Sequence, residues 1–255
     1  MGPADRYNQI YTGWKGRLTD LKNTLYVLGD SIARGIVFSE KTGGYTISKN
    51  TFDVALKTAG VKVYNYAKMG MTSENALSLI DRCEKAENAV AAIEFGGNDS
   101  DLNWNEVASA PNTFHEAAVP IPEYEKNIVS LAKKAKSLGM RPVIVTPLPL
   151  LAEKFFDYVS ENRDGNAILS YLGTKQNIYR WQERYAAAAV RAAYSADCPV
   201  FDARGLFLNR MDFDSLIGPD GMHPSEKGYK VIADAVMNAW KNGIRPFTES
   251  VPCEK

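Results

Sequence analysis

Residues 25–32 of the chain read Leu-Tyr-Val-Leu-Gly-Asp-Ser-Ile, an apolar run that ends in a glycine, an acid and a serine. The run predicts a buried strand over Thr24–Leu28. Gly29 permits a tight turn after the strand, so Ser31 is expected to stand exposed at the edge of a sheet. A simpler interpretation fits the same residues equally well, in which Asp30 or Ser31 only caps a helix.

Four more apolar runs of this kind follow along the chain, and longer segments with helical periodicity separate them. The expected strands are Val61–Tyr66, Val90–Phe95, Pro142–Thr146 and Pro199–Asp202. The expected helices are Thr72–Cys83, Pro122–Leu138, Thr174–Ala196 and Ser225–Asn242. This alternation of strands and helices predicts a parallel sheet with helices on both of its faces.

The chain of 255 residues has the length of one α/β domain. We expect an N-terminal extension over residues 1–22, a single domain over 23–245 and a tail over 246–255. In the extension, Tyr7, Tyr11 and Trp14 are expected to cover an edge of the core or to pack against another subunit. The stretches Ser100–Pro120 and Pro147–Gly173 are long for connections that follow strands, which makes them candidates for the walls of a pocket.

Composition argues against several classes of function. Thirty Lys and Arg residues balance thirty Asp and Glu residues, so no net charge draws the protein to nucleic acid or to anionic lipid. Three scattered cysteines and two histidines give neither a disulfide framework nor a zinc motif, and no cofactor is expected. The first 20 residues lack the layout of a signal peptide and no run reaches membrane-spanning length, which favours a cytoplasmic protein. No sequence feature indicates an oligomeric state.

The segment Asp220-Gly221-Met222-His223 precedes the last expected helix. A neutral imidazole can take the proton of a serine when an acceptor holds its other ring nitrogen. Asp220 stands three residues before His223, and Gly221 lets the backbone curl so that the carboxylate can reach the ring. The other histidine, His115, is interpreted as a loop residue at the pocket rim or on the surface.

Two further motifs follow predicted strands. Gly96-Gly97-Asn98-Asp99 places a side-chain amide at the same sheet edge as Ser31, where an N–H donor could stabilise the oxyanion of a tetrahedral intermediate. Asn98 also fits an ordinary turn. The segment Lys68–Ser73 contains Gly70, whose backbone N–H is open to a ligand because no side chain blocks it.

Taken together, the serine, glycine, asparagine and histidine blocks, in this order, resemble the SGNH superfamily of GDSL esterases and lipases. The likeness runs from Tyr26 to Trp240, and Ile32 stands where the family motif has leucine. The resemblance implies a flavodoxin-like three-layer α/β/α sandwich with a five-stranded parallel sheet.

Carried over to this sequence, the resemblance makes Ser31 the nucleophile, His223 the base and Asp220 the acid that orients it. The oxyanion hole would consist of the Ser31 and Gly70 backbone N–H groups and the Asn98 side chain.

The expected reaction is hydrolysis of a carboxylic ester through an acyl-enzyme, without metal or cofactor. A short-acyl ester, such as an O-acetylated carbohydrate, is the favoured substrate, in a pocket that includes Asp30, Trp104, Phe155 and Met222. Lysophospholipase, thioesterase and acyltransferase activities remain open on the same site. A non-catalytic ligand-binding protein of the same fold is the alternative from another class.

Overall fold

The computed structural model describes residues 23–39 and 41–242, and the expectations for Tyr7, Tyr11, Trp14 and the tail lie outside them. Five strands form a central sheet in the order β4-β1-β5-β6-β7, and every neighbouring pair is parallel. The strands are β1 (Thr24–Gly29), β4 (Lys62–Asn65), β5 (Val90–Glu94), β6 (Arg141–Val145) and β7 (Val200–Phe201). The predicted five-stranded parallel sheet is confirmed, with strand ends that differ from the expected ones by at most one residue.

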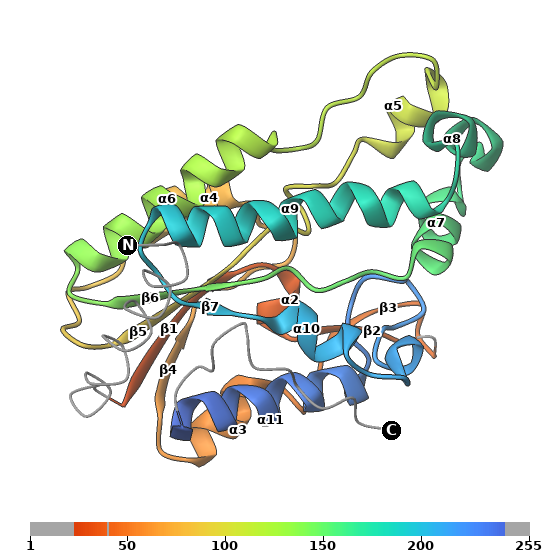
Figure 1. Cartoon of the computed structure of the whole chain (residues 1–255). Helices are drawn as coiled ribbons and strands as arrows, with labels where there is room; N and C mark the ends of the chain where they lie inside the picture. Colours follow the sequence, from red (N-terminus) through yellow and green to blue (C-terminus); the bar gives the residue numbers. More distant parts are fainter. Residues whose placement is uncertain (1–22, 40, 243–255) are drawn as a thin grey trace.

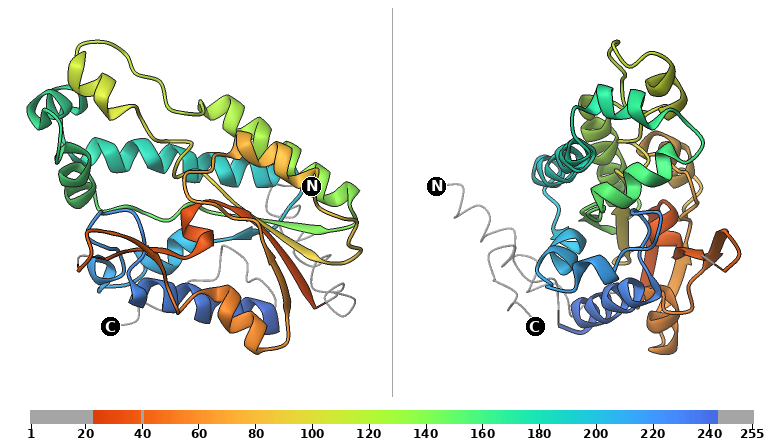
Figure 2. Two further views of the ribbon diagram at one scale, coloured as in Figure 1. Left: turned by 180° about the vertical axis from the view of Figure 1, so that it is seen from behind. Right: turned by 90° about the vertical axis from the view of Figure 1, so that its right-hand side faces the viewer.

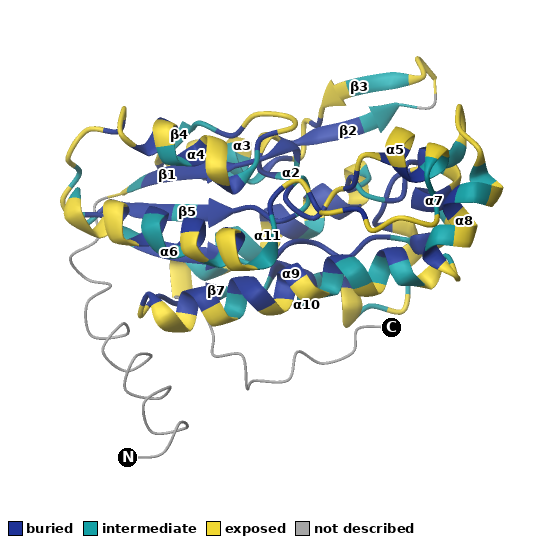
Figure 3. Ribbon diagram, turned by 90° about the horizontal axis from the view of Figure 1, so that it is seen from above, coloured by how far each residue is buried: buried dark blue, intermediate teal, exposed yellow. Residues whose placement is uncertain are grey.

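Helices cover both faces of this sheet, so the molecule has the three layers of an α/β/α sandwich (Figures 1 and 2). One layer holds α4 (Ser73–Ile80), α6 (Ile121–Ser137) and α9 (Gln176–Ser195). The other layer holds α3 (Phe52–Thr58), α10 (Ala203–Leu208) and α11 (Glu226–Asn242). The inner strands β1, β5 and β6 are mostly buried, as Figure 3 shows for β1 and β5. No helix in the described part of the chain is long and apolar enough to cross a membrane.

A short helix and a hairpin follow β1. The cap interpretation of Asp30 and Ser31 allowed for the helix, but the sequence analysis did not predict the hairpin. The helix α2 (Ser31–Arg34) begins at the serine itself. The hairpin consists of β2 (Ile36–Ser39) and β3 (Gly44–Ile47), which are antiparallel and lie outside the main sheet. Its consequence is that Tyr45 is carried from β3 to the functional edge of the molecule, where its ring packs against His223.

The two long connections fold into helices of their own instead of remaining loops. They form α5 (Trp104–Ser109), α7 (Ala152–Ser160) and α8 (Gly165–Leu172), which gather beyond the strand ends (Figure 1). A separate apolar cluster holds them together, with Trp104, Phe155 and Ile168 among its members. A single turn of 3₁₀ helix, η2 (Phe213–Ser215), lies before the loop that carries Asp220 and His223.

Buried tyrosines anchor helices to the loops around the sheet edge. Tyr124 of α6 is fully buried, and its hydroxyl donates a hydrogen bond of 2.8 Å to the carbonyl oxygen of Phe95, the residue after β5. The same hydroxyl oxygen would lie 3.2 Å from a Cβ atom at Gly96, which is a glycine with φ of +132°. Tyr124 therefore fixes the backbone that leads into Asn98.

We expect Tyr124→Phe to lower the free energy of unfolding by about 1–2 kcal/mol, because the buried Phe95 carbonyl loses a donor that water does not replace. Tyr194→Phe is the matched control: this side chain is 51% exposed, and its substitution should change stability by less than about 0.5 kcal/mol. Urea denaturation of both variants checks the prediction. Equal values for the two variants would contradict it.

Candidate active site

Three residues from opposite ends of the chain form a continuous line of hydrogen bonds. His223 Nε2 lies 2.9 Å from Ser31 Oγ, and His223 Nδ1 lies 2.7 Å from Asp220 Oδ2. All three side chains are buried, with Ser31 7% and His223 4% exposed. In this arrangement the carboxylate accepts from one ring nitrogen, which leaves the other ring nitrogen free to accept the serine proton.

The loop before α11 holds Asp220 in place through its own backbone. Asp220 Oδ1 accepts hydrogen bonds of 3.1 Å from the backbone N–H groups of Met222 and His223. Burial alone would raise the pKa of Asp220, but the hydrogen bonds to the His223 ring and to these N–H groups outweigh it and lower the pKa. The carboxylate is therefore ionised when the imidazole accepts a proton.

Gly221 makes this curl of the backbone feasible, as the sequence predicted. Its φ is +75°, and the residue lies against the start of α7. A Cβ atom there would stand 2.3 Å from the backbone nitrogen of Phe155 and 2.9 Å from the carbonyl oxygen of Leu151. The Leu151 N–H donates to the Gly221 carbonyl oxygen at 2.8 Å, so the loop and the insertion are joined backbone to backbone.

Asp30 caps a helix and also contacts a second turn of the candidate site, so the cap interpretation and the functional interpretation of the segment are compatible. Its Oδ1 accepts from the Ile32 N–H at 2.9 Å, which caps α2, while its Oδ2 accepts from Asn98 Nδ2 at 3.2 Å. Complete burial raises the pKa of Asp30 to about 6, against the opposing effect of the Ile32 N–H. The carboxylate thus connects the turn after β1 to the turn after β5.

The Asn98 amide is held from two sides. Besides Asp30, its Nδ2 donates to the carbonyl oxygen of Met71 at 3.1 Å. Met71 follows Gly70, which has φ of +76° and open space around its Cα. The structure therefore brings the turns that contain Ser31, Gly70 and Asn98 together at one sheet edge, although Gly70 is exposed and does not line the cavity described below.

The sequence analysis did not recognise two buried acidic residues, Asp99 and Glu94, as part of the candidate site. Asp99, which follows Asn98, accepts from the backbone N–H of Ser73 at 2.9 Å and so fixes the start of α4. Glu94, the last residue of β5, is 5% exposed, and its Oε2 lies 3.5 Å from the Asp30 backbone nitrogen. The position of each beside the glycine-rich turn was visible in the sequence, but their burial was not.

Burial raises the pKa of Glu94 well above its ordinary value of 4.5, and the nearby Asp30 carboxylate raises it further. Glu94 Oε1 has no hydrogen-bond partner within the described residues. We therefore assign the proton of this buried pair to Glu94, because Asp30 receives donors from Ile32 and Asn98 that favour its ionised form.

Tyr45 covers His223 on the side of the hairpin. The two rings lie 5.1 Å apart in an edge-to-face arrangement, and the Tyr45 hydroxyl donates to the Tyr158 hydroxyl at 3.0 Å. Burial, followed by the hydrogen bond with Tyr158 and the charge of Asp220, raises the pKa of Tyr45. No sequence motif marks Tyr45, because only the hairpin brings it to the histidine.

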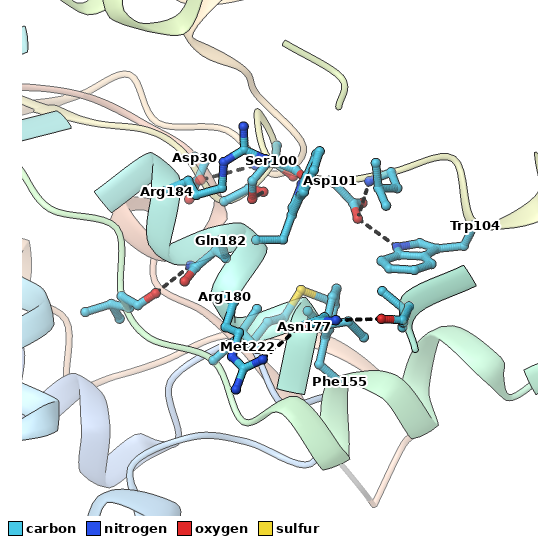
Figure 4. Close-up of a pocket in the computed structure, with 18 of the residues that line it drawn as sticks. Asp30, Ser100, Asp101, Trp104, Phe155, Asn177, Arg180, Gln182, Arg184 and Met222 are labelled. Carbon is cyan, nitrogen blue, oxygen red and sulfur yellow. Dashed lines mark hydrogen bonds between the residues drawn. The ribbon is translucent and has the colours of Figure 1, made fainter. Parts of the chain in front are cut away.

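A cavity of about 490 Å³ opens in front of Ser31 and His223. Every residue that the sequence analysis placed in the pocket lines it: Asp30, Trp104, Phe155 and Met222 (Figure 4). The helix α9 forms another wall, which the sequence analysis did not foresee. Most of the surrounding side chains are apolar, including Leu102, Leu150, Leu172 and Ile178.

His115 is neither in the cavity lining nor on the surface. It is 8% exposed; its Nε2 lies 2.9 Å from the Ala110 carbonyl oxygen, and its ring packs against Tyr171 at 5.1 Å. Its role is to order the insertion between β5 and α6. Among residues 23–39 and 41–242, no group of three or more His, Cys, Asp or Glu side chains is arranged to hold a metal ion.

We expect Gly221→Ala to lower the free energy of unfolding by about 2–5 kcal/mol, since a Cβ atom adds left-handed strain and pushes against the Phe155 backbone. Gly60→Ala is the matched control, because φ there is +81° but a Cβ atom would meet nothing within 4 Å. It should cost only the strain, about 1–2 kcal/mol. Urea denaturation measures both; the prediction is wrong if the two losses are equal.

Glu94→Gln should flatten the dependence of stability on pH. Because the pKa of Glu94 is raised in the folded state, that state keeps the proton above pH 4.5, where the unfolded chain releases it. The free energy of unfolding therefore falls as the pH rises from 4.5 toward the folded pKa, by at most about 1.4 kcal/mol per pH unit. Urea denaturation at pH 5 and pH 8 should show a smaller fall in the free energy of unfolding for the variant than for the wild type. An equal fall in both proteins would contradict the assignment of the proton to Glu94.

Comparison with known proteins gives the family. A model of the GDSL-like lipase/acylhydrolase family matches residues 25–236. The chain is 27% identical over 223 residues to a GDSL esterase/lipase from Oryza sativa subsp. japonica, which covers 85% of this chain and 77% of the relative. It is also 28% identical over 171 residues to an isoamyl acetate-hydrolyzing esterase from Saccharomyces cerevisiae. That alignment covers 66% of this chain and 64% of the yeast protein.

Solved structures share the fold at lower sequence identity. A lipase/acylhydrolase from Enterococcus faecalis superposes with a TM-score of 0.56 at 17% identity, covering 89% of this chain and 99% of that one. An acetylxylan esterase from Geobacillus stearothermophilus gives 0.57 at 17% identity, covering 88% and 97%. Because the family model runs from β1 into α11, across every turn of the site, the chain belongs to the GDSL-like lipase/acylhydrolase family of SGNH hydrolases and is an ester-hydrolysing enzyme.

Proposed function

We propose that Ser31, His223 and Asp220 form the catalytic triad and that the protein hydrolyses short-acyl carboxylic esters through an acyl-enzyme. The observation that supports this most directly is the line of hydrogen bonds from Ser31 Oγ through the His223 ring to Asp220. Residues 192 positions apart in sequence meet there in hydrogen-bonding geometry at the mouth of a cavity. This is the arrangement that nucleophilic catalysis by serine needs.

In the first half of the reaction, Ser31 Oγ attacks the carbonyl carbon of the ester while its proton passes to His223 Nε2. The bond to the alcohol then breaks, and the alcohol leaves with the proton that His223 gives back. In the second half, His223 takes a proton from water while the water oxygen attacks the acyl carbon. The bond between that carbon and Ser31 Oγ then breaks, His223 returns the proton to Oγ, and the acid leaves. Asp220 keeps its negative charge throughout and stabilises the imidazolium.

The oxyanion of each tetrahedral intermediate would lie between the backbone N–H groups of Ser31 and Gly70 and the side chain of Asn98. In the ligand-free protein the Asn98 amide donates to Asp30 and to the Met71 carbonyl oxygen. The oxyanion is expected to compete for these N–H groups, and because the amide is already oriented, little rearrangement is needed. A preorganised donor of this kind contributes about 3 kcal/mol to the barrier reduction.

A short acyl group is the preferred substrate feature. The yeast relative is an isoamyl acetate-hydrolyzing esterase, and a structural neighbour is an acetylxylan esterase. Acetyl esters are therefore named both for a relative in sequence and for a neighbour in structure. An acetylated carbohydrate fits this proposal because the cavity offers Trp104 and Phe155 as flat apolar surfaces.

Purified protein should hydrolyse p-nitrophenyl acetate, and Ser31→Ala should lower kcat by on the order of 10³-fold or more, because the nucleophile is removed. Ser78→Ala is the matched control, since this serine is exposed on α4 and should retain full activity. A fluorophosphonate probe should label the wild type and leave Ser31→Ala unlabelled. Wild-type activity in Ser31→Ala would disprove the triad, and an unlabelled wild type would favour the non-catalytic binding protein.

A further inference from the structure

The α9 wall of the cavity carries two arginines. Arg180 and Arg184 are four residues apart, which places them on the same side of the helix. Both line the cavity that also contains Ser31 and His223, and Figure 4 shows them among its side chains. No motif of the family resemblance includes either residue, and the reaction described above uses neither.

Each guanidinium group is held by neutral partners. Arg180 Nη1 donates to Asn177 Oδ1 at 3.1 Å, and the Asn177 amide in turn donates to the Leu172 carbonyl oxygen at 2.6 Å. Arg184 lies over the ring of Trp181, with its guanidinium carbon 4.6 Å from the ring centroid. Neighbouring residues of the cavity therefore restrain both side chains.

Trp181 is itself anchored close to the reacting groups. Its Nε1 donates to the carbonyl oxygen of Ser100 at 2.8 Å, and Ser100 Oγ donates to the Gly97 carbonyl oxygen at 2.8 Å. The stack of Arg184 on Trp181 is thus connected through Ser100 to the turn that carries Asn98. Arg184 is exposed, so its positive charge lies at the solvent-facing rim of the active-site cavity, where Trp181 connects it to the oxyanion turn.

These two charges lack a carboxylate counterpart within the described part of the chain. Among residues 23–39 and 41–242, no carboxylate lies within 4 Å of the Arg180 or Arg184 guanidinium, whereas Arg191, further along α9, is paired with Glu125. A guanidinium does not lose its proton at any physiological pH. The cavity therefore keeps two permanent positive charges.

The carboxylates that line the cavity are already occupied. Asp30 accepts from Ile32 and Asn98, and Asp101 Oδ1 accepts from the Leu102 N–H at 3.0 Å and from Trp104 Nε1 at 2.8 Å. Both carboxylates thus already accept hydrogen bonds from neutral donors of the protein. The positive charges of Arg180 and Arg184 on the α9 wall are thus available to an anionic ligand.

Building on the proposed hydrolase function, we propose that the enzyme prefers esters that carry an anionic group, a carboxylate or a phosphate, which one of the exposed guanidinium groups of Arg180 and Arg184 binds at the rim of the cavity, while the other adds to the positive potential there and Ser31 attacks the ester carbonyl. The planar fork of a guanidinium matches the paired oxygens of either anion. The apolar walls accommodate the carbon skeleton between the anion and the ester. Specificity then comes from a charge at a distance from the scissile bond.

Two substrate pairs test this proposal and distinguish the two anions. The carboxylate pair is mono-p-nitrophenyl glutarate and p-nitrophenyl pentanoate, whose acyl chains have the same length. The phosphate pair is monoacetylglycerol phosphate and monoacetylglycerol. Hydrolysis of this pair is measured as the release of acetate. We expect kcat/KM to be about tenfold higher for the anionic member of at least one pair, the size of one charge-assisted hydrogen bond.

Arg180→Gln and Arg184→Gln should each reduce the ratio of anionic to neutral kcat/KM, and the double variant should bring it to one or below. Added salt should reduce the wild-type ratio as well, because it screens a solvent-accessible charge. Arg191→Gln is the matched control on the same helix: this residue is paired with Glu125 outside the cavity, so the ratio should stay at its wild-type value.

A wild-type ratio of one or below in both pairs would overturn the inference while leaving the hydrolase function intact, and so would a raised ratio that persists in the double variant. Failure to hydrolyse any ester would instead overturn the proposed function. In that case, calorimetric binding of mono-p-nitrophenyl glutarate and of glycerol phosphate to Ser31→Ala decides the inference. Binding that the double Arg variant loses supports an anion site, and no binding of either ligand refutes it.

Discussion

The carboxylate of Asp30 is the contact on which the site depends. It is buried between two turns that follow neighbouring strands, and it accepts a hydrogen bond from each of them. One of these bonds fixes the start of α2, where Ser31 stands, and the other fixes the Asn98 amide. Without this shared acceptor, Ser31 and the Asn98 amide, the proposed nucleophile and oxyanion donor, would be held by separate loops, each with its own freedom.

The parts of the fold that could be predicted are those in which local pattern and tertiary environment agree. The apolar run before Gly29 is buried on both sides in the middle of the sheet, so its hydrophobicity reports its position directly. The same is true of the buried face of α11. The site followed from this, because the carboxyl ends of parallel strands lie at one edge, and the motifs stand where those strands end.

The hairpin β2–β3 was missed for a physical reason. It lies outside the main sheet. The strand β2 contributes only the short apolar run Ile36–Phe38, and β3 has no buried residue, so its sequence forms no apolar run of the kind that marks a buried strand. Tyr45 contacts His223 only because this hairpin folds over the loop. Glu94 was missed for the opposite reason: it belongs to a correctly predicted strand, but the sequence does not show that a carboxyl group at its end is buried. The arginines of α9 were likewise indistinguishable from any charged helix surface until the structure placed them at the rim of the cavity.

The contacts of α7 join the wall of the cavity to the loop that carries His223. Through Leu151 and Phe155, the start of this helix abuts the Gly221 turn, and through Tyr158 it holds the tyrosine that packs on His223. An exchange of this insertion between relatives, made to change which esters are accepted, would also remove the supports of the histidine. The cavity wall and the proposed base, His223, thus share their structural supports. A graft that preserves activity must carry the Gly221 contact and the tyrosine pair along with the pocket residues.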